Sequence, residues 1–312
     1  MSSRRSLIVI LAVTVLAALP VSAQTRYPLT VVDDAGNTVL LPGPPRRIVS
    51  LTLATDEVLL SLVAKSRLIA VTTFAADRAV SNVADLCSDI PHKLAMNVEA
   101  IVSLQADLVL VAPWSDPGPV QQLRNAGVPV FMMASGLTVE SIEEKIEKLS
   151  RMLGEPEKGR EMVAGMDARL AAVFERISRL PREKRARVLD YGIAGSAQGR
   201  GSSWDEIVRL AGLIDAVADI APDRWGQVPL SREKILQIDP DILVLPGWVY
   251  GDPRGAAAFS ARITGDPAFR ALTAVRAKRV YMMPENLKGT TSQYIVSAVE
   301  WLARTAYPAL FD

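Results

Sequence analysis

Two stretches of the chain, 97–114 (NVEAIVSLQADLVLVAPW) and 231–248 (SREKILQIDPDILVLPGW), align without a gap at an offset of 134 residues. Each begins with a residue that favours helix N-termini, Asn97 or Ser231, and has a glutamate in the first turn, where the helix dipole stabilises a carboxylate. An apolar run opened by an aspartate follows, and a tryptophan stands three residues beyond that run. The alignment therefore predicts the same helix–strand–loop unit twice.

The position of these units in a sheet predicts where a ligand binds. In a parallel α/β sheet the helices run antiparallel to the strands, so helix N-termini share an edge with the carboxyl ends of the strands. Open α/β sheets bind ligands at that edge. We therefore expect Trp114 and Trp248 on loops at the binding edge, one in each lobe, with Glu99 and Glu233 on the same rims. Two such edges facing each other predict a cleft.

Strand-like and helix-like segments alternate through most of the chain, which predicts mostly parallel sheets with helices on both faces. A hairpin is expected over 29–32 and 38–41. Strands are then expected at 48–51, 68–71, 108–111, 128–133, 188–191, 242–245 and 280–283. Helices are expected at 56–64, 98–105, 118–126, 203–212, 232–238 and 292–306.

One long helical segment interrupts this alternation. Apolar residues recur every three or four positions from Met162 to Ile177, after Gly154 and before Pro181. At 1.5 Å per residue such a helix is roughly 39 Å long, more than one small lobe needs. We expect an α/β protein of two Rossmann-like α/β lobes, joined by one long rigid α-helix, with a ligand cleft between the lobes. The expected boundaries are 1–23 (signal peptide), 24–154 (N-terminal lobe), 155–181 (connecting helix) and 182–312 (C-terminal lobe).

The first residues have the pattern of a secretory signal peptide. Arg4 and Arg5 precede an apolar run over 7–19, and Val21-Ser22-Ala23 ends in the small residues of a cleavage site. The run is shorter than the roughly 20 residues that span a bilayer. No cysteine follows the expected cleavage site, which argues against a lipoprotein. We expect cleavage after Ala23 and a periplasmic protein.

Composition excludes several classes of protein. The 312 residues are 49% hydrophobic and 22% charged, with a formal net charge of +1, which argues against a disordered chain and against a nucleic-acid partner. One cysteine and one histidine, His92, argue against a disulfide framework, a Cys/His metal site and a histidine-based catalytic site. The chain has no phosphate-binding loop, nucleophile elbow or His-Glu-x-x-His motif. We expect no cofactor and no enzymatic activity, with an exported enzyme, sensor or chaperone as alternatives.

Several motifs resemble the periplasmic solute-binding proteins of the vitamin B12 and iron-chelate type, whose lobes are joined by one long helix. These motifs lie at 46–51 with 55–57, 97–99 with 106–110, 121–130, 230–233, 239–241 and 301–308. The resemblance implies a binding protein that delivers a metal chelate to the permease of an ATP-driven (ABC) importer in the inner membrane. In that family one glutamate of each lobe docks to the permease, and Glu99 and Glu233 occupy the matching positions. The usual glycine after the first helix is absent here, where Leu62-Val63-Ala64-Lys65 stands.

The residues leave the ligand open. Haem would need a tyrosine or histidine ligand, for which Tyr191, Tyr250 and His92 are candidates. An anionic siderophore would call for arginines such as Arg200 and Arg224. A corrinoid, a large and mostly neutral macrocycle, would need aromatic walls. Candidates for these walls are Trp114, Trp248, Tyr250, Tyr191, Trp204, Trp225 and Phe74. Residues 96–102 are most similar to corrinoid binders, so a cobamide is favoured over a siderophore or haem, with molybdate third, and a monomer is expected.

Overall fold

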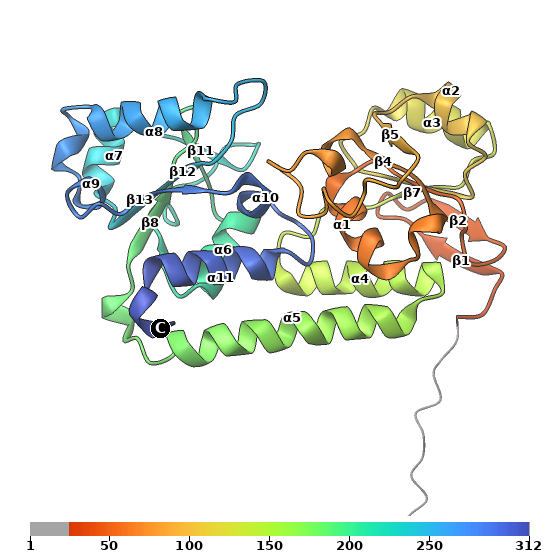
Figure 1. Ribbon diagram of the computed structural model, residues 1–312, viewed down its shortest axis with the longest axis horizontal. Helices are drawn as coiled ribbons and strands as arrows, with labels where there is room; N and C mark the ends of the chain where they lie inside the picture. The colour runs from red at the N-terminus through yellow and green to blue at the C-terminus, as the bar shows by residue number, and fades with distance from the viewer. Residues whose placement is uncertain (1–24, 312) are drawn as a thin grey trace, which may run out of the picture.

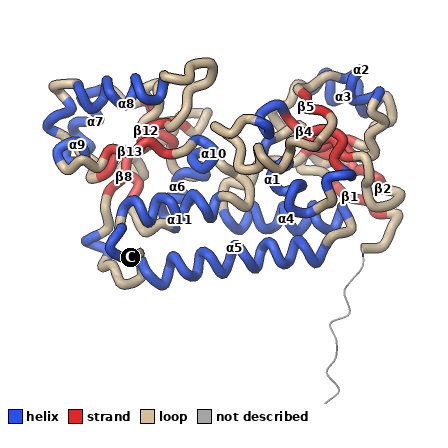
Figure 2. Tube along the Cα trace, viewed as in Figure 1, coloured by secondary structure: helices blue, strands red, loops and turns tan. Residues whose placement is uncertain are grey.

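The computed structural model describes residues 25–311, which form two α/β lobes above a base of helices (Figure 1, Figure 2). The expected signal peptide and its cleavage site lie outside the described residues. The predicted fold class is confirmed, because each lobe contains a parallel sheet with helices packed against it. Within 25–311, none of the helices combines the length and apolar character that crossing a membrane requires.

A five-stranded parallel sheet in the order β5-β4-β3-β6-β7 forms the centre of the N-terminal lobe. Its strands are β3 (Ile48–Ser50), β4 (Leu68–Thr72), β5 (His92–Leu94), β6 (Leu108–Val111) and β7 (Val130–Met132). The main helices are α1 (Leu53–Leu62), α2 (Val98–Ser103) and α3 (Pro117–Asn125). The central strands β3 and β6 are buried on both faces and, apart from Ser50 at the end of β3, are apolar, as is typical of parallel sheets.

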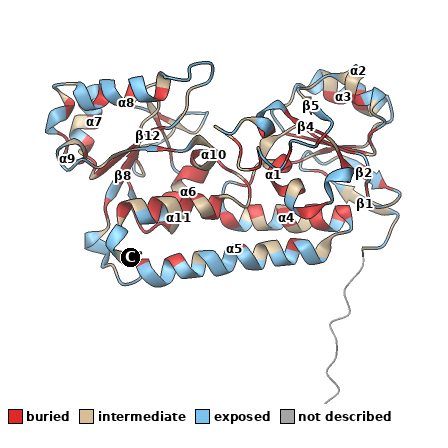
Figure 3. Cartoon of the chain, viewed as in Figure 1, coloured by how far each residue is buried: buried red, intermediate tan, exposed pale blue. Residues whose placement is uncertain are grey.

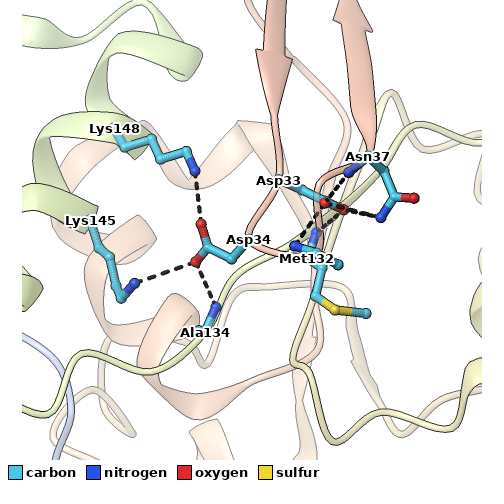
Figure 4. Close-up of polar contacts among 8 residues, drawn as sticks. Asp33, Asp34, Asn37, Met132, Ala134, Lys145 and Lys148 are labelled. Carbon is cyan, nitrogen blue, oxygen red and sulfur yellow. Dashed lines mark hydrogen bonds and ion pairs between the residues drawn. The ribbon is translucent and has the colours of Figure 1, made fainter.

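The predicted hairpin at the start of the chain is present and is anchored to the N-terminal lobe. It consists of β1 (Leu29–Val32) and β2 (Thr38–Leu41). In its turn, a carboxylate oxygen of Asp34 lies 2.8 Å from Nζ of Lys148, and Asp33 accepts a hydrogen bond of 3.2 Å from the backbone N–H of Met132 (Figure 4). These contacts tie the hairpin to α4 (Val139–Leu153) and to β7.

The C-terminal lobe repeats the arrangement with a four-stranded parallel sheet in the order β10-β8-β12-β13. Its strands are β8 (Arg187–Asp190), β10 (Ile214–Asp215), β12 (Ile242–Pro246) and β13 (Val280–Met283), and β9 (Ser196–Gln198) pairs with β11 (Gln227–Pro229). Its helices are α6 (Ser203–Leu210), α7 (Arg232–Ile238), α8 (Gly255–Gly265), α9 (Thr273–Arg276), α10 (Glu285–Lys288) and α11 (Ile295–Ala306).

The base joins the lobes through α4, α5 (Pro156–Ile177) and α11. The 22 residues of α5 extend about 33 Å at 1.5 Å per residue, and the helix runs beneath both lobes (Figure 1). Much of its outer surface is exposed, whereas the faces of α4 and α11 toward the lobes are buried (Figure 3). One apolar core extends from Ile48 in the N-terminal lobe through Met166 of α5 to Val188 in the C-terminal lobe. A shared core of this kind opposes wide movement of the lobes.

The two aligned stretches fold alike. The side chain of Asn97 accepts a hydrogen bond from the backbone of Ala100 at 2.9 Å, and that of Ser231 accepts one from Lys234 at 3.1 Å. Each helix then leads through a residue with a left-handed backbone, Gln105 (φ 49°) or Asp239 (φ 41°), into β6 or β12. The predicted repeat of helix, strand and loop is therefore present in the structure.

Candidate functional site

A cavity of about 290 Å³ lies between the lobes and is lined by both of them. The N-terminal lobe contributes Leu53, Ala54, Glu57, Phe74 and Val80. The C-terminal lobe contributes Trp248, Glu285, Asn286, Gly289, Thr290 and Thr291. We call this cavity the cleft. A larger hollow of about 540 Å³ is lined by residues near β1, α4 and the start of α5, and does not join the two lobes.

Glu57 is the centre of a polar network at the back of the cleft. Its side chain, on α1 of the N-terminal lobe, is buried and accepts a hydrogen bond from Ser292 of the C-terminal lobe. Its other oxygen accepts hydrogen bonds from the backbone and side chain of Asn82, at 3.0 and 2.8 Å. Burial raises the pKa of Glu57, and the hydrogen bonds from Ser292 and Asn82 oppose that rise. A buried carboxyl group is thus shared between the lobes.

An asparagine pair adds to this network. The amide of Asn82 donates a 2.7 Å hydrogen bond to the carbonyl oxygen of Asn286, and the amide of Asn286 donates a 2.9 Å bond back to the Asn82 side chain. The amide of Gln293 donates to the carbonyl oxygen of Glu57 at 2.9 Å. These bonds hold α1 and the loop that contains Asn82, both in the N-terminal lobe, against residues 286–293 of the C-terminal lobe.

A buried ion pair lies next to the cleft in the C-terminal lobe. Nζ of Lys288 is 2.7 Å from Oδ1 of Asp190, and both side chains are buried. Glu285, one helical turn before Lys288, lines the cleft. Burial raises the pKa of Glu285, whereas the nearby Lys288 lowers it and Asp190 raises it further. Lys288 is therefore paired with Asp190, and among residues 25–311 Glu285 forms no salt bridge.

Trp248 is held in place by its neighbours. A Cβ atom on Gly247 would overlap the carbonyl oxygen of Met283, so the loop after β12 packs on the end of β13 in a way that only glycine allows. The ring of Trp248 meets that of Tyr250 edge to face, with 5.8 Å between centroids. Tyr250 itself is 78% exposed. Phe74, across the cleft, is partly exposed and supplies a second aromatic surface.

A sequence profile of periplasmic binding proteins matches residues 48–287. The chain belongs to the periplasmic binding protein family. It is 24% identical to an uncharacterized ABC transporter substrate-binding lipoprotein of Bacillus subtilis, over 91% of this chain and 87% of that protein. It is 26% identical to a cobalamin-binding protein of Halobacterium salinarum, over 70% of this chain but only 58% of that protein. The molybdate-bound binding protein of Haemophilus influenzae has the same fold, with a TM-score of 0.75 and 18% identity over 91% of this chain and 92% of that one.

The two glutamates expected to dock to a permease lie at matching places in this binding protein. Glu99 is in the first turn of α2 and Glu233 in the first turn of α7, and both are exposed. The backbone N–H of Glu233 and the side chain of Ser231 lower the pKa of Glu233, so its carboxyl group is ionised at neutral pH. Neither glutamate forms a salt bridge within residues 25–311.

Of the predicted ligand-binding aromatic residues, Phe74 and Trp248 meet in the cleft. Trp114 and Trp225 are 71% and 73% exposed, and neither lines the cleft cavity. Tyr191 is half-buried and packs against Phe259 in the C-terminal lobe, with 5.8 Å between ring centroids. Trp204 is fully buried in the core, which corrects the expectation that it forms part of a ligand wall.

The remaining predicted polar candidates are exposed. Arg224 stacks on Trp225, with 4.8 Å between the guanidinium carbon and the ring centroid, and Arg200 lies in the turn after β9. His92 is exposed on the edge strand β5. Among residues 25–311, no three side chains of His, Cys, Asp or Glu gather where they could hold a metal ion.

Sequence reasoning missed the polar part of the cleft. Glu57 belongs to a Thr-Asp-Glu motif in α1, and Glu285, Asn286 and Thr290 follow the end of β13. The signal that could have found the latter group is its position, because polar residues just after a parallel strand lie at the ligand-binding edge. No sequence signal indicates that Glu57 reaches across to Ser292.

Proposed function

We propose that this protein is the substrate-binding component of an ABC importer, which captures a metal chelate outside the cytoplasm and delivers it to an inner-membrane permease. The observation that carries the proposal is the cleft itself, which both lobes line and which combines Phe74 and Trp248 with a polar back wall. Its relative in Bacillus subtilis is described as a substrate-binding lipoprotein of an ABC transporter, which supports the same role. In this role the expected location is the periplasm.

A cobamide is the favoured ligand within this proposal. The relative from Halobacterium salinarum is a cobalamin-binding protein, although the match spans only part of that protein. The cleft volume of about 290 Å³ is at the lower end for small-molecule sites. A corrinoid would therefore insert one edge and lay the rest of its surface against exposed aromatic residues such as Tyr250. An iron siderophore or haem is the alternative ligand, and an exported sensor, chaperone or enzyme is the alternative class.

Binding can be tested on residues 24–312 by native mass spectrometry and absorbance, with cyanocobalamin, haem, ferric siderophores and molybdate offered in turn. The proposal expects a complex of one protein and one cyanocobalamin molecule. A mass shift with haem or a siderophore, but not with cyanocobalamin, would replace the favoured ligand. A shift with molybdate alone would contradict the macrocycle proposal, and turnover of any ligand would favour an enzyme.

The transport role needs a separate test in cells. In this proposal Glu99 and Glu233 meet arginines of the permease, so the double charge reversal E99R/E233R should abolish uptake while leaving ligand binding unchanged. The matched control reverses two other exposed glutamates, Glu144 and Glu183, and should retain uptake. Normal uptake by E99R/E233R would contradict the docking role.

A further inference from the structure

The wall of the cleft carries acids but no bases. Of the described residues that line it, Glu57 and Glu285 are acidic and none is Lys or Arg. Lys288 lies just behind the wall, but its ammonium group is paired with Asp190 at 2.7 Å. A ligand entering this cavity therefore meets carboxyl groups rather than a cationic surface.

Most polar groups on the wall already have partners. Glu57 accepts hydrogen bonds from Ser292 and Asn82, and Asn286 pairs with Asn82. The hydroxyl group of Thr290 lies 3.1 Å from that of Ser292. These groups hold the lobes together, so their hydrogen-bonding capacity is not free for a ligand.

Glu285 is different. It stands at the first position of α10, directly after β13, and within residues 25–311 no protein donor satisfies its buried Oε2 atom. Buried acceptors of this kind are almost always satisfied in native proteins. Because Glu285 lines the cavity and is only half-buried, a rotation of its side chain brings this unused acceptor to a ligand that carries hydrogen-bond donors.

We infer that the cleft selects a neutral or cationic chelate whose edge donates hydrogen bonds, and that Glu285 is the residue that rejects anionic ligands. The inference rests on the proposed binding function. A carboxamide N–H at the ligand edge would donate to Glu285, whereas a carboxylate in the same place would meet like charge in a partly desolvated site. Among chelates, this favours corrinoids with peripheral amides and ferric hydroxamates over haem with its propionates and over molybdate.

The test uses a pair of ligands that differ in one group. Cyanocobalamin and its monocarboxylic acid derivatives, each with one peripheral amide replaced by a carboxylate, are titrated against the mature chain by calorimetry. At least one acid should bind the wild type roughly 10- to 100-fold more weakly than cyanocobalamin, as expected for a mispaired polar group. E285Q should shrink that ratio about tenfold. The control E144Q makes the same chemical change on the exposed face of α4 and should leave the ratio unchanged.

Two results would overturn the inference. One is that all the acids bind the wild type within about twofold of cyanocobalamin; the other is that E285Q leaves the ratio unchanged while thermal melting shows it folded. If cyanocobalamin does not bind but a cationic ferric hydroxamate does, the cobamide assignment fails and the charge preference stands. If only haem or molybdate binds, the charge preference itself is wrong.

Discussion

Asp107 in the N-terminal lobe and Asp241 in the C-terminal lobe support their sheets in the same way, yet the loops beyond them differ. Asp107 accepts a hydrogen bond of 2.8 Å from the backbone of Arg47, and Asp241 accepts one of 2.7 Å from Arg187. Each arginine side chain donates in turn to a carbonyl group at the end of the preceding helix of the repeat, α2 or α7. The scaffold that places the binding edge is thus the same in both lobes.

Beyond the strands the lobes diverge. Trp114 extends into solvent, whereas Trp248 lines the cleft. The residue before each tryptophan also differs, because Gly247 packs against the carbonyl group of Met283 whereas Pro113 stands at the matching place in the N-terminal lobe. The N-terminal lobe instead contributes Phe74 and α1. The repeat therefore fixes where the loops leave the two sheets, but the loops beyond the strands take different courses in the two lobes.

The largest predicted effect concerns the ion pair at the end of β8, where the N-terminal lobe has the uncharged Ser50 at the end of β3. K288M would leave Asp190 buried without its cation and should lower the free energy of unfolding by about 3–5 kcal/mol, measured by urea titration. S50A removes a buried hydroxyl hydrogen bond and should cost about 1 kcal/mol. If K288M and S50A lose the same free energy of unfolding, the stability of the C-terminal lobe does not depend on this charge pair.

The second prediction concerns the buried acids of the two lobes. Burial raises the pKa of Asp56 to about 7, while its Oδ1 atom has no hydrogen-bond partner among residues 25–311. In the unfolded chain the carboxyl group ionises near its ordinary value of 3.8. This group therefore lowers the free energy of unfolding as the pH rises from about 4 to about 7, by up to about 1.4 kcal/mol per pH unit, with no further change above.

D56N should remove that dependence. In urea titrations at pH 5, 6, 7 and 8, the free energy of unfolding of D56N should rise relative to that of the wild type up to pH 7. Above pH 7 the difference between the two proteins should be constant. In the C-terminal lobe, burial raises the pKa of Asp215 to about 6. The free energy of unfolding of D215N should therefore rise relative to that of the wild type only up to a pH of about 6. A difference between D56N and the wild type that does not change with pH would contradict the assignment.

The third prediction separates the two tryptophans. If the proposed cleft binds the chelate, W248A should weaken binding by roughly 30-fold or more, because an aromatic residue that becomes covered by its ligand in a binding site contributes about 2 kcal/mol or more. W114A should change the affinity less than about threefold. Both affinities are measured by calorimetry with whichever ligand the native mass spectrometry described under Proposed function identifies. A larger loss from W114A would mean that the lobes contribute to the site more symmetrically than the cavity indicates.

The fold was largely predictable, because its strands are short apolar runs with polar ends. The strands at 108–111 and 280–283 and the helix at 232–238 were predicted with the bounds that the structure has. The edge strand β5 was not, because three residues that include His92 and Lys93 have no apolar pattern. Nor was α4, although its buried residues repeat along one face.

The site was less predictable than the fold. The repeat placed Trp248 just after a strand, and the structure puts it on the wall of the candidate cleft. Trp204 was expected as a wall residue only because it is aromatic, and it lies buried on the apolar face of α6 with Ile207 and Val208. Glu285 had only one signal, its position just after β13. Glu57 could not be found, because its importance comes from a contact with Ser292 of the other lobe, 235 residues away in the sequence. Sequence patterns report local periodicity and say little about such contacts.

The smallest predicted effect tests whether the matching arginines of the two lobes, Arg47 and Arg187, stabilise their lobes by the same amount. R47A removes guanidinium hydrogen bonds to the carbonyl groups of Leu104 and Gln105, and R187A removes one to Ile238. Each variant should lose about 1 kcal/mol in urea titrations, because these hydrogen bonds lie at the surface or are only partly buried. R47K keeps the charge but not the planar fork, so it should resemble R47A. A loss confined to one lobe would mean that the repeat conserves geometry without conserving the energy that maintains it.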